Sequence, residues 1–121
     1  MDLALSVLVG AIALQHLSFF VLESFLWRTP FGRKVFKMSA EQAEATAVLA
    51  VNQGVYNAFL AAGLAWSVLA EPGLALPLRS FFLGCVLVAG LVGGLTAARS
   101  ILLVQALPAA IALAGVLAFR T

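Results

Sequence analysis

The stretch LALSVLVGAIALQHLSFFVLESFLW, residues 3–27, decides the fold of this chain. It is apolar almost throughout, and a helix needs about 20 such residues to cross the hydrocarbon core of a bilayer. Asp2 is the only charge before it, so it lacks the basic start of a secretory signal, and it is too long for the apolar core of one. The stretch therefore predicts a retained membrane-spanning helix.

Three further apolar stretches of comparable length follow, at residues 40–69, 79–98 and 100–119. The whole chain is 64% hydrophobic and 10% charged, whereas a soluble domain is about half apolar and about a quarter charged. A chain this short buries only about two-thirds of its surface on folding, so a bilayer must take up the remaining apolar area. We expect an all-α integral membrane four-helix bundle that forms a single domain over residues 1–121.

The connections between these stretches carry residues that end or begin helices. Thr29 should end the first helix, because the residue before Pro30 is pushed out of the helical region, and the basic segment after it is expected to be a loop with a flexible turn at glycine. SAEQ, residues 39–42, is a capping box that should start the second helix. EPGLALP, residues 71–77, should end that helix with its two prolines, and Pro108 is expected to kink the fourth.

The distribution of Lys and Arg predicts the orientation, because basic loops tend to stay on the cytoplasmic side. Five basic residues fall on one side of the membrane and two on the other, which predicts a multi-pass protein of the bacterial cytoplasmic (inner) membrane with both termini outside. The five are Arg28, Arg33, Lys34, Lys37 and Arg99, and the two are Arg79 and Arg120. The basic loop should contact anionic membrane lipid. The basic residues form no stripe, so no nucleic acid partner is expected.

His16 and Glu23 are ionisable residues at membrane depth, where such groups are costly and usually face other helices, a partner or water. Seven residues apart on a helix, they lie within about 20° of one face and about 10 Å apart along the axis. They are candidates for acid and base. Simpler interpretations stay open: His16 can be hydrogen-bonded to a neighbouring helix, and Glu23 can pair with Arg28 or Arg33 at the membrane surface.

The second helix carries NQGVYN, residues 52–57, the densest polar cluster of the chain. Asn52 and Tyr56 are one turn apart, and so are Gln53 and Asn57, which makes a broad polar stripe. Such side chains hold helices together in lipid at about 0.6 kcal/mol per contact. Four of them within six positions also suit a ligand site between helices.

These residues together predict an intramembrane polar pocket. The candidate catalytic residues are His16, Glu23 and Tyr56, and the candidate substrate-binding residues are Asn52, Gln53, Asn57 and Gln105. The chain has a single histidine and no Ser-His-Asp, HExxH, GxGxxG or Walker spacing, so no metal site is predicted. Cys85, the lone cysteine, is expected to be a packing residue.

The segments QHLSFFVLESFLWRTPFGRKVF, NQGVYNAFLAAGL, FFLGCVLVAG and VQALPA resemble a family of short bacterial membrane proteins known as DUF1304, a domain of unknown function. The resemblance spans nearly the whole chain and implies a four-helix membrane fold without an established activity. In the family pattern an acidic residue often precedes the histidine, where this chain has Gln15. That departure weakens any mechanism built on an adjacent carboxylate and imidazole.

VNQGVYN is also faintly similar in layout to the second helix of styrene oxide isomerase, a small four-helix haem enzyme. The histidine position of that enzyme is Asn or Gln here, so the likeness does not carry a haem across. The cofactor is therefore left open, with His16 as a possible single axial haem ligand.

Three functions fit these features. The first is a membrane-embedded protein that binds or isomerises a small lipid-soluble substrate by acid/base chemistry. The second is a small proton-coupled transporter or exporter, and the third is a structural or assembly subunit of a membrane complex. The two halves of the sequence show no inverted repeat, which favours the first over the second. A homo-oligomer is expected in all three cases, because four helices enclose little space and the third helix is rich in glycine.

Overall fold

A computed structural model describes residues 2–121, and within this range every regular element is a helix. The elements are α1 (Leu3–Ser24), α2 (Pro30–Val35), α3 (Ala40–Leu69), α4 (Pro72–Thr96), the π-helical η1 (Leu102–Ala106) and α5 (Leu107–Phe119). Four segments are long and apolar enough to cross a membrane: α1, α3, α4 and the continuous helix formed by η1 and α5. The expected all-α fold with four long apolar helices is confirmed.

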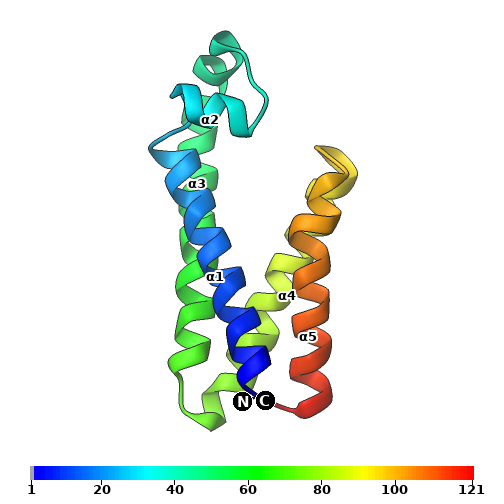
Figure 1. Ribbon diagram of the computed structural model, residues 1–121. Helices are drawn as coiled ribbons and strands as arrows, with labels where there is room; N and C mark the ends of the chain where they lie inside the picture. The colour runs from blue at the N-terminus through cyan, green and yellow to red at the C-terminus, as the bar shows by residue number, and fades with distance from the viewer. Residues whose placement is uncertain (1) are drawn as a thin grey trace. The chain divides into compact units, whose positions relative to one another are not determined.

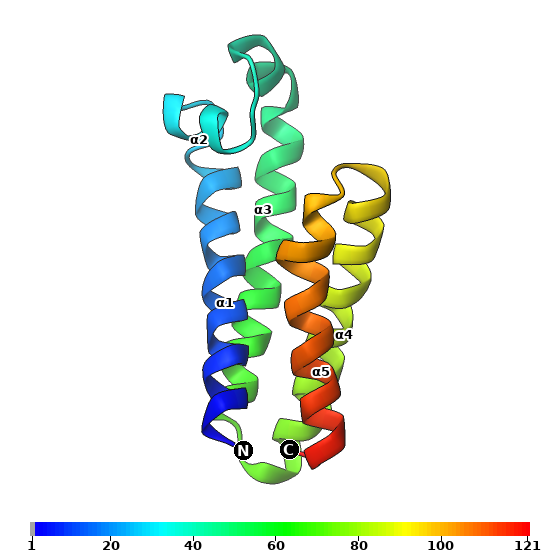
Figure 2. The same ribbon diagram turned by 45° about the vertical axis from the view of Figure 1, so that its right-hand side comes forward.

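The chain forms two compact units. The central unit is Leu14–Ala61, and the terminal unit is the chain up to Ala13 together with Ala62–Thr121. In the central unit α1 and α3 run side by side, and α2 lies at the end where the chain passes from one to the other (Figures 1 and 2). In the terminal unit α4 and α5 run side by side and are joined by a short turn (Figures 1 and 2).

The connection between α1 and α3 contains a helix that the sequence interpretation missed. α1 ends at Ser24, before Trp27, and the basic segment that was expected to be a loop begins as α2. Thr29 caps it, since its hydroxyl accepts the Gly32 N–H at 3.1 Å, and Pro30 takes the first helical position, where no N–H is needed. The expectation of a flexible turn at Gly32 is wrong, because Gly32 is buried in α2 and a Cβ there would overlap the Leu26 carbonyl.

The start of α3 follows the capping box that the sequence predicts. The Ser39 hydroxyl accepts the Gln42 N–H at 3.1 Å, and the Gln42 side-chain oxygen accepts the Ser39 N–H at 2.9 Å. Small residues then line the buried stripe of α3, at Ala43, Ala50, Gly54 and Ala61. Their spacing of seven and four residues keeps them on one face, so this face lets another helix approach closely.

In the terminal unit α4 begins at Pro72, earlier than the start at residue 79 expected from the sequence. Pro72 stands at the first helical position, where a missing N–H costs nothing, and Pro77 is tolerated inside the helix at the loss of one hydrogen bond. The break between α3 and α4 is therefore confined to Ala70 and Glu71.

The fourth span is irregular where the sequence places Pro108. Its first part, η1, is a π-helical turn in which the Leu107 N–H bonds to the Leu102 carbonyl, five residues back. A wide turn of this kind is a common way to accommodate a disturbed helix. Gly90 of α4 packs directly on it, since a Cβ at Gly90 would lie 2.7 Å from the Ala106 nitrogen. The two helices of this hairpin thus meet backbone to backbone.

Candidate functional site

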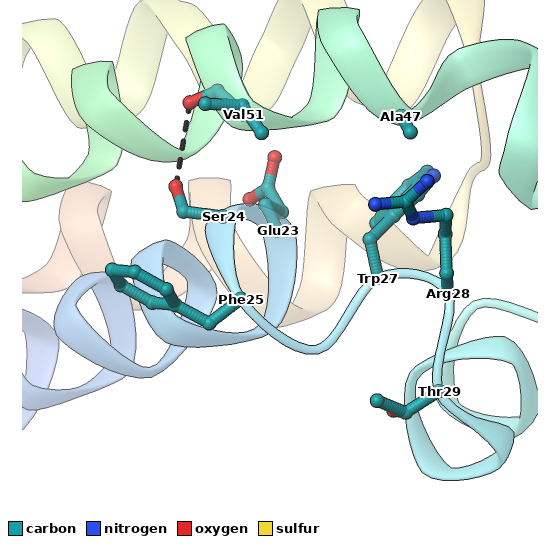
Figure 3. A pocket seen from close by; sticks show the side chains of 8 residues that line it. All are labelled: Glu23, Ser24, Phe25, Trp27, Arg28, Thr29, Ala47 and Val51. Carbon is teal, nitrogen blue, oxygen red and sulfur yellow. Dashed lines mark hydrogen bonds between the residues drawn. The ribbon is translucent and has the colours of Figure 1, made fainter.

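A buried carboxylate in the last turn of α1 is the centre of the site. Glu23 is 9% exposed and Asn57 of α3 is 8% exposed. The Asn57 side-chain amide donates a hydrogen bond of 2.7 Å to the Glu23 carboxylate. One residue further along α1, the Ser24 hydroxyl donates to the Val51 carbonyl of α3 at 3.3 Å (Figure 3). Two adjacent residues of α1 are therefore bonded to α3.

Gly54 makes this approach possible. It is buried on α3, three residues before Asn57. A Cβ on Gly54 would overlap the Ser24 hydroxyl and would lie 3.2 Å from the Glu23 Cβ. Since any larger residue would push α1 away, the missing side chain at position 54 brings the Glu23 carboxylate within hydrogen-bond distance of Asn57.

A pocket of about 310 Å³ opens beside this carboxylate, and we call it the Glu23 pocket. It is lined by Glu23, Ser24, Phe25, Trp27, Arg28, Thr29, Ala47 and Val51. The Glu23 carboxylate points from α1 toward the α3 ribbon, and Trp27 and Arg28 reach toward the same helix (Figure 3). The lining therefore combines one acid, one base, two hydroxyls and two aromatic rings around a space at the end of a membrane span.

The basic residue of the pocket does not neutralise the acid. Arg28 forms an ion pair with Glu44 at 3.2 Å, and it is the one ion pair among residues 2–121. The sequence left open that Glu23 pairs with Arg28 or Arg33, but the partner of its carboxylate is the neutral amide of Asn57. Glu23 is thus an acidic group in a spanning helix that is hydrogen-bonded rather than ion-paired.

Trp27 closes one side of the pocket. Its indole N–H donates to the Thr46 hydroxyl of α3 at 3.0 Å, and its ring lies 4.8 Å from that of Phe36, centroid to centroid. The Thr46 hydroxyl in turn donates to the Gln42 carbonyl at 2.7 Å. The indole is therefore held in place by α3 on one side and by Phe36, the residue that follows α2, on the other.

The other candidates for catalysis lie outside this lining. His16 is fully buried on α1, and its ring meets that of Phe19 edge to face at 5.6 Å. Tyr56 is 55% exposed, with its ring 6.1 Å from that of Phe59. Neither of the two lines the Glu23 pocket. Among the three candidate catalytic residues, the structure places only Glu23 in this pocket.

The four candidate substrate-binding residues also separate. Asn57 is buried against Glu23, whereas Asn52 and Gln53 are exposed on α3. Gln105 is half-buried in η1 of the terminal unit. The polar stripe expected for residues 52–57 is thus split between a buried and an exposed face of α3. α1 covers the face that carries Gly54 and Asn57, and it leaves the neighbouring face exposed.

Sequence reasoning missed several members of the pocket. Ser24 follows Glu23, and a hydroxyl next to a buried acid is a readable signal, whereas Thr29 was considered only as the residue that ends the first helix. Ala47 and Val51 carry no such signal, because only the packing of α3 against α1 places them there. Within residues 2–121, no three His, Cys, Asp or Glu residues lie close enough to hold a metal ion.

Residues 10–117 match the family described as protein of unknown function, DUF1304. The matched range takes in Glu23, Asn57 and every residue that lines the Glu23 pocket. No curated protein and no solved structure matches the chain. Since the match covers most of the chain and four of its helices are candidate membrane spans, the protein is a small multi-pass membrane protein that belongs to the DUF1304 family.

Proposed function

We propose that the protein binds a small lipid-soluble molecule in the Glu23 pocket and shifts a proton on it with Glu23 as the acid/base group. The observation that carries the proposal is the Glu23 carboxylate, which is buried, accepts a hydrogen bond from the neutral amide of Asn57 and lines a pocket of about 310 Å³. Ionisable groups at membrane depth generally mark functional sites. The volume lies at the lower end of the range for small-molecule pockets, about 300–1,000 Å³.

The lining suits a ligand that is mostly apolar with one polar group. Phe25, Ala47 and Val51 supply apolar contacts, and the indole of Trp27 supplies a rigid aromatic wall. Such a molecule would enter from the bilayer, because the pocket lies where the span α1 ends. The ligand class is therefore a small amphiphile or lipophile rather than a water-soluble metabolite.

The chemistry that needs the fewest groups is an isomerisation. Glu23 would take a proton from a carbon next to a polarised oxygen and return it at another position of the same molecule, so that no atom is gained or lost. The guanidinium of Arg28 would stabilise the negative charge that develops on that oxygen. Asn57 would hold the Glu23 carboxylate in one orientation through its 2.7 Å hydrogen bond.

Native mass spectrometry of protein extracted gently from membranes, combined with an absorption spectrum, tests the binding step. Wild-type protein should carry a small-molecule adduct, and Glu23→Ala should lose it. Glu41→Gln is the matched control, because Glu41 is an exposed acid at the start of α3, away from the pocket. The proposal is wrong if the wild type carries no adduct, or if Glu23→Ala and Glu41→Gln retain it equally. The absorption spectrum would also reveal a haem bound through His16.

His16 and Tyr56 remain separate candidates for the same chemistry. Once the ligand is identified, measuring turnover by His16→Ala and Tyr56→Phe tests whether these two residues take part in the reaction. Loss of turnover in a variant that still folds would assign the residue to the reaction. Normal turnover in both would leave Glu23 as the acid/base residue of the pocket.

Proton-coupled transport is the second candidate, and the same buried carboxylate favours it, since a carboxylate held by a neutral amide can exchange a proton for a cationic substrate. Proton uptake into proteoliposomes measures this. Uptake that Glu23→Gln abolishes would favour the transporter, and uptake unchanged in Glu23→Gln would exclude it.

We also propose that the protein forms a homo-oligomer, and this proposal rests on exposed polar residues of α3 rather than on the Glu23 pocket. Asn52, Gln53 and Tyr56 are exposed on a helix long enough to span the bilayer, and amide groups in hydrocarbon are costly without partners. A second copy would supply those partners. If these residues serve only assembly, substituting them should lower the oligomer order seen by native mass spectrometry without changing ligand binding.

A further inference from the structure

Arg79 is a buried cation that the Glu23 pocket does not explain. It lies on α4, about 10 Å along the helix from Pro72, and it is 5% exposed. One of its terminal nitrogens donates to the Ser67 carbonyl at 2.9 Å, whereas its Nε is buried without a hydrogen-bond partner. A guanidinium offers five N–H donors and is always charged. A single backbone carbonyl satisfies only a small part of it.

A second pocket, of about 260 Å³, lies against this guanidinium, and we call it the Arg79 pocket. It is lined by Ser6, Val68, Ala70, Pro72, Ala75, Arg79, Arg120 and Thr121, all within the terminal unit. Figures 1 and 2 show where these elements meet, at the end of this unit where α4 starts and α5 finishes. Since several spans end there, the pocket lies at the level of a membrane surface.

Among its side chains, the lining holds two cations and no acid. Arg120, which follows the last residue of α5, is the second arginine of the pocket. Neither acid of the terminal unit lines it: Asp2 accepts the Ala4 N–H at 2.6 Å, and Glu71 is exposed on the outside. Ser6 and Thr121 add hydroxyls. The side chains of the Arg79 pocket therefore carry two positive charges without a paired acidic side chain, and the Nε–H of Arg79 has no hydrogen-bond acceptor.

We propose that the Arg79 pocket binds a phosphate-bearing anion between Arg79 and Arg120. A guanidinium matches two oxygens of a phosphate with parallel N–H bonds, and two arginines would hold it from two directions. The pocket volume is several times the roughly 30 Å³ that one water occupies, which leaves room for a phosphate with its ester oxygens. A phospholipid headgroup and free phosphate share this chemistry.

Binding of dioleoylphosphatidylglycerol to the delipidated full-length protein in detergent tests the proposal. Native mass spectrometry gives the affinity, and dioleoylglycerol, which has the same chains and no phosphate, is the control lipid. Phosphatidylglycerol should bind, and dioleoylglycerol should bind at least about tenfold more weakly, since a charge-assisted hydrogen bond of this kind accounts for about a factor of ten or more.

Three arginine variants locate the site. Arg120→Gln should weaken phosphatidylglycerol binding by about tenfold, and Arg79→Lys should also weaken it because lysine keeps the charge but loses the two-pronged geometry. Arg99→Gln, an exposed arginine in the turn at the other end of α4, removes the same charge outside the pocket and should change nothing. Arg120→Gln stays informative even if substitution of the buried Arg79 prevents folding.

Inorganic phosphate at millimolar concentration distinguishes the two sources of the ligand. If phosphate displaces phosphatidylglycerol, the pocket takes the anion from water. If the lipid binds and phosphate does not compete, the ligand is a headgroup whose chains lie along the helices. The proposal is overturned if neither probe binds the wild type, or if Arg120→Gln and Arg79→Lys bind the lipid as well as Arg99→Gln does.

Discussion

The side-chain amide of Asn57 donates a 2.7 Å hydrogen bond to the carboxylate of Glu23, and both residues are buried in helices long enough to span a bilayer. The partners lie 34 positions apart in the chain. This bond joins α1 to α3, and it sets the orientation of the acid that lines the Glu23 pocket. Every function proposed for that pocket depends on it.

Substitution of Asn57 should lower the free energy of unfolding more than substitution of Glu23 by glutamine. Asn57→Ala leaves the buried carboxylate without its donor and should lower the free energy of unfolding by about 1–3 kcal/mol. Glu23→Gln keeps an oxygen that accepts the same bond, so its cost should stay below about 1 kcal/mol. Unfolding in mixed micelles with increasing denaturing detergent measures both values.

The double variant gives the control for this pair. If the hydrogen bond is the cause, the effects of Glu23→Gln and Asn57→Ala should not add, because a neutral amide at position 23 loses less than a carboxylate does when its donor is removed. Additive effects would mean that the two residues stabilise the protein independently.

Gly54 should not tolerate a side chain. Gly54→Ala places a methyl group on the Ser24 hydroxyl, and such overpacking typically costs about 1–3 kcal/mol. Gly84→Ala is the matched control in a helix, since nothing lies within 4 Å of a Cβ at that position. It should be neutral or stabilising by up to about 1 kcal/mol, because alanine favours the helix. Equal thermal midpoints for the two variants would contradict the close packing of α1 on α3.

The hydrogen bond between Trp27 and Thr46 should contribute more to the stability of the protein than the nearby ion pair between Arg28 and Glu44. Thr46→Val removes the acceptor of the indole N–H and should cost about 0.5–1.5 kcal/mol. Arg28→Gln breaks the ion pair with Glu44, whose side chains are 63% and 70% exposed, and should cost less than about 1 kcal/mol. The tryptophan emission maximum should shift in Thr46→Val and stay unchanged in Arg28→Gln. If Arg28→Gln lowered the stability more than Thr46→Val, the ion pair rather than the indole hydrogen bond would be the main contact at this end of α3.

The predicted orientation can be measured with single cysteines in a Cys85→Ser background. Lys37→Cys should react with a membrane-impermeant maleimide in inverted membrane vesicles but not in intact cells, because the basic connection is predicted to be cytoplasmic. Thr121→Cys should show the opposite pattern. Labelling of Lys37→Cys in intact cells would reverse the predicted topology and would place the Arg79 pocket on the cytoplasmic side.

Local rules account for the parts of the fold that were predicted. Length and apolarity alone indicate four spanning helices, since a bilayer imposes the same requirement on any sequence. The capping box at residues 39–42 was readable because its two hydrogen bonds join residues three apart. The early start of α4 at Pro72 was missed, since proline both ends one helix and begins the next.

The sequence by itself determined that His16 and Glu23 stand in an apolar run long enough to span a bilayer, because length and composition alone decide this. Only the tertiary structure decided which polar residues meet. Gly54 lets α1 cover Asn57 and leaves Tyr56 exposed, although the two are adjacent in the chain. Likewise the short break between α3 and α4 lets the Arg79 guanidinium reach back to the Ser67 carbonyl. Partners distant in sequence are chosen by how closely two backbones approach, and that distance depends on small residues on both helices at once.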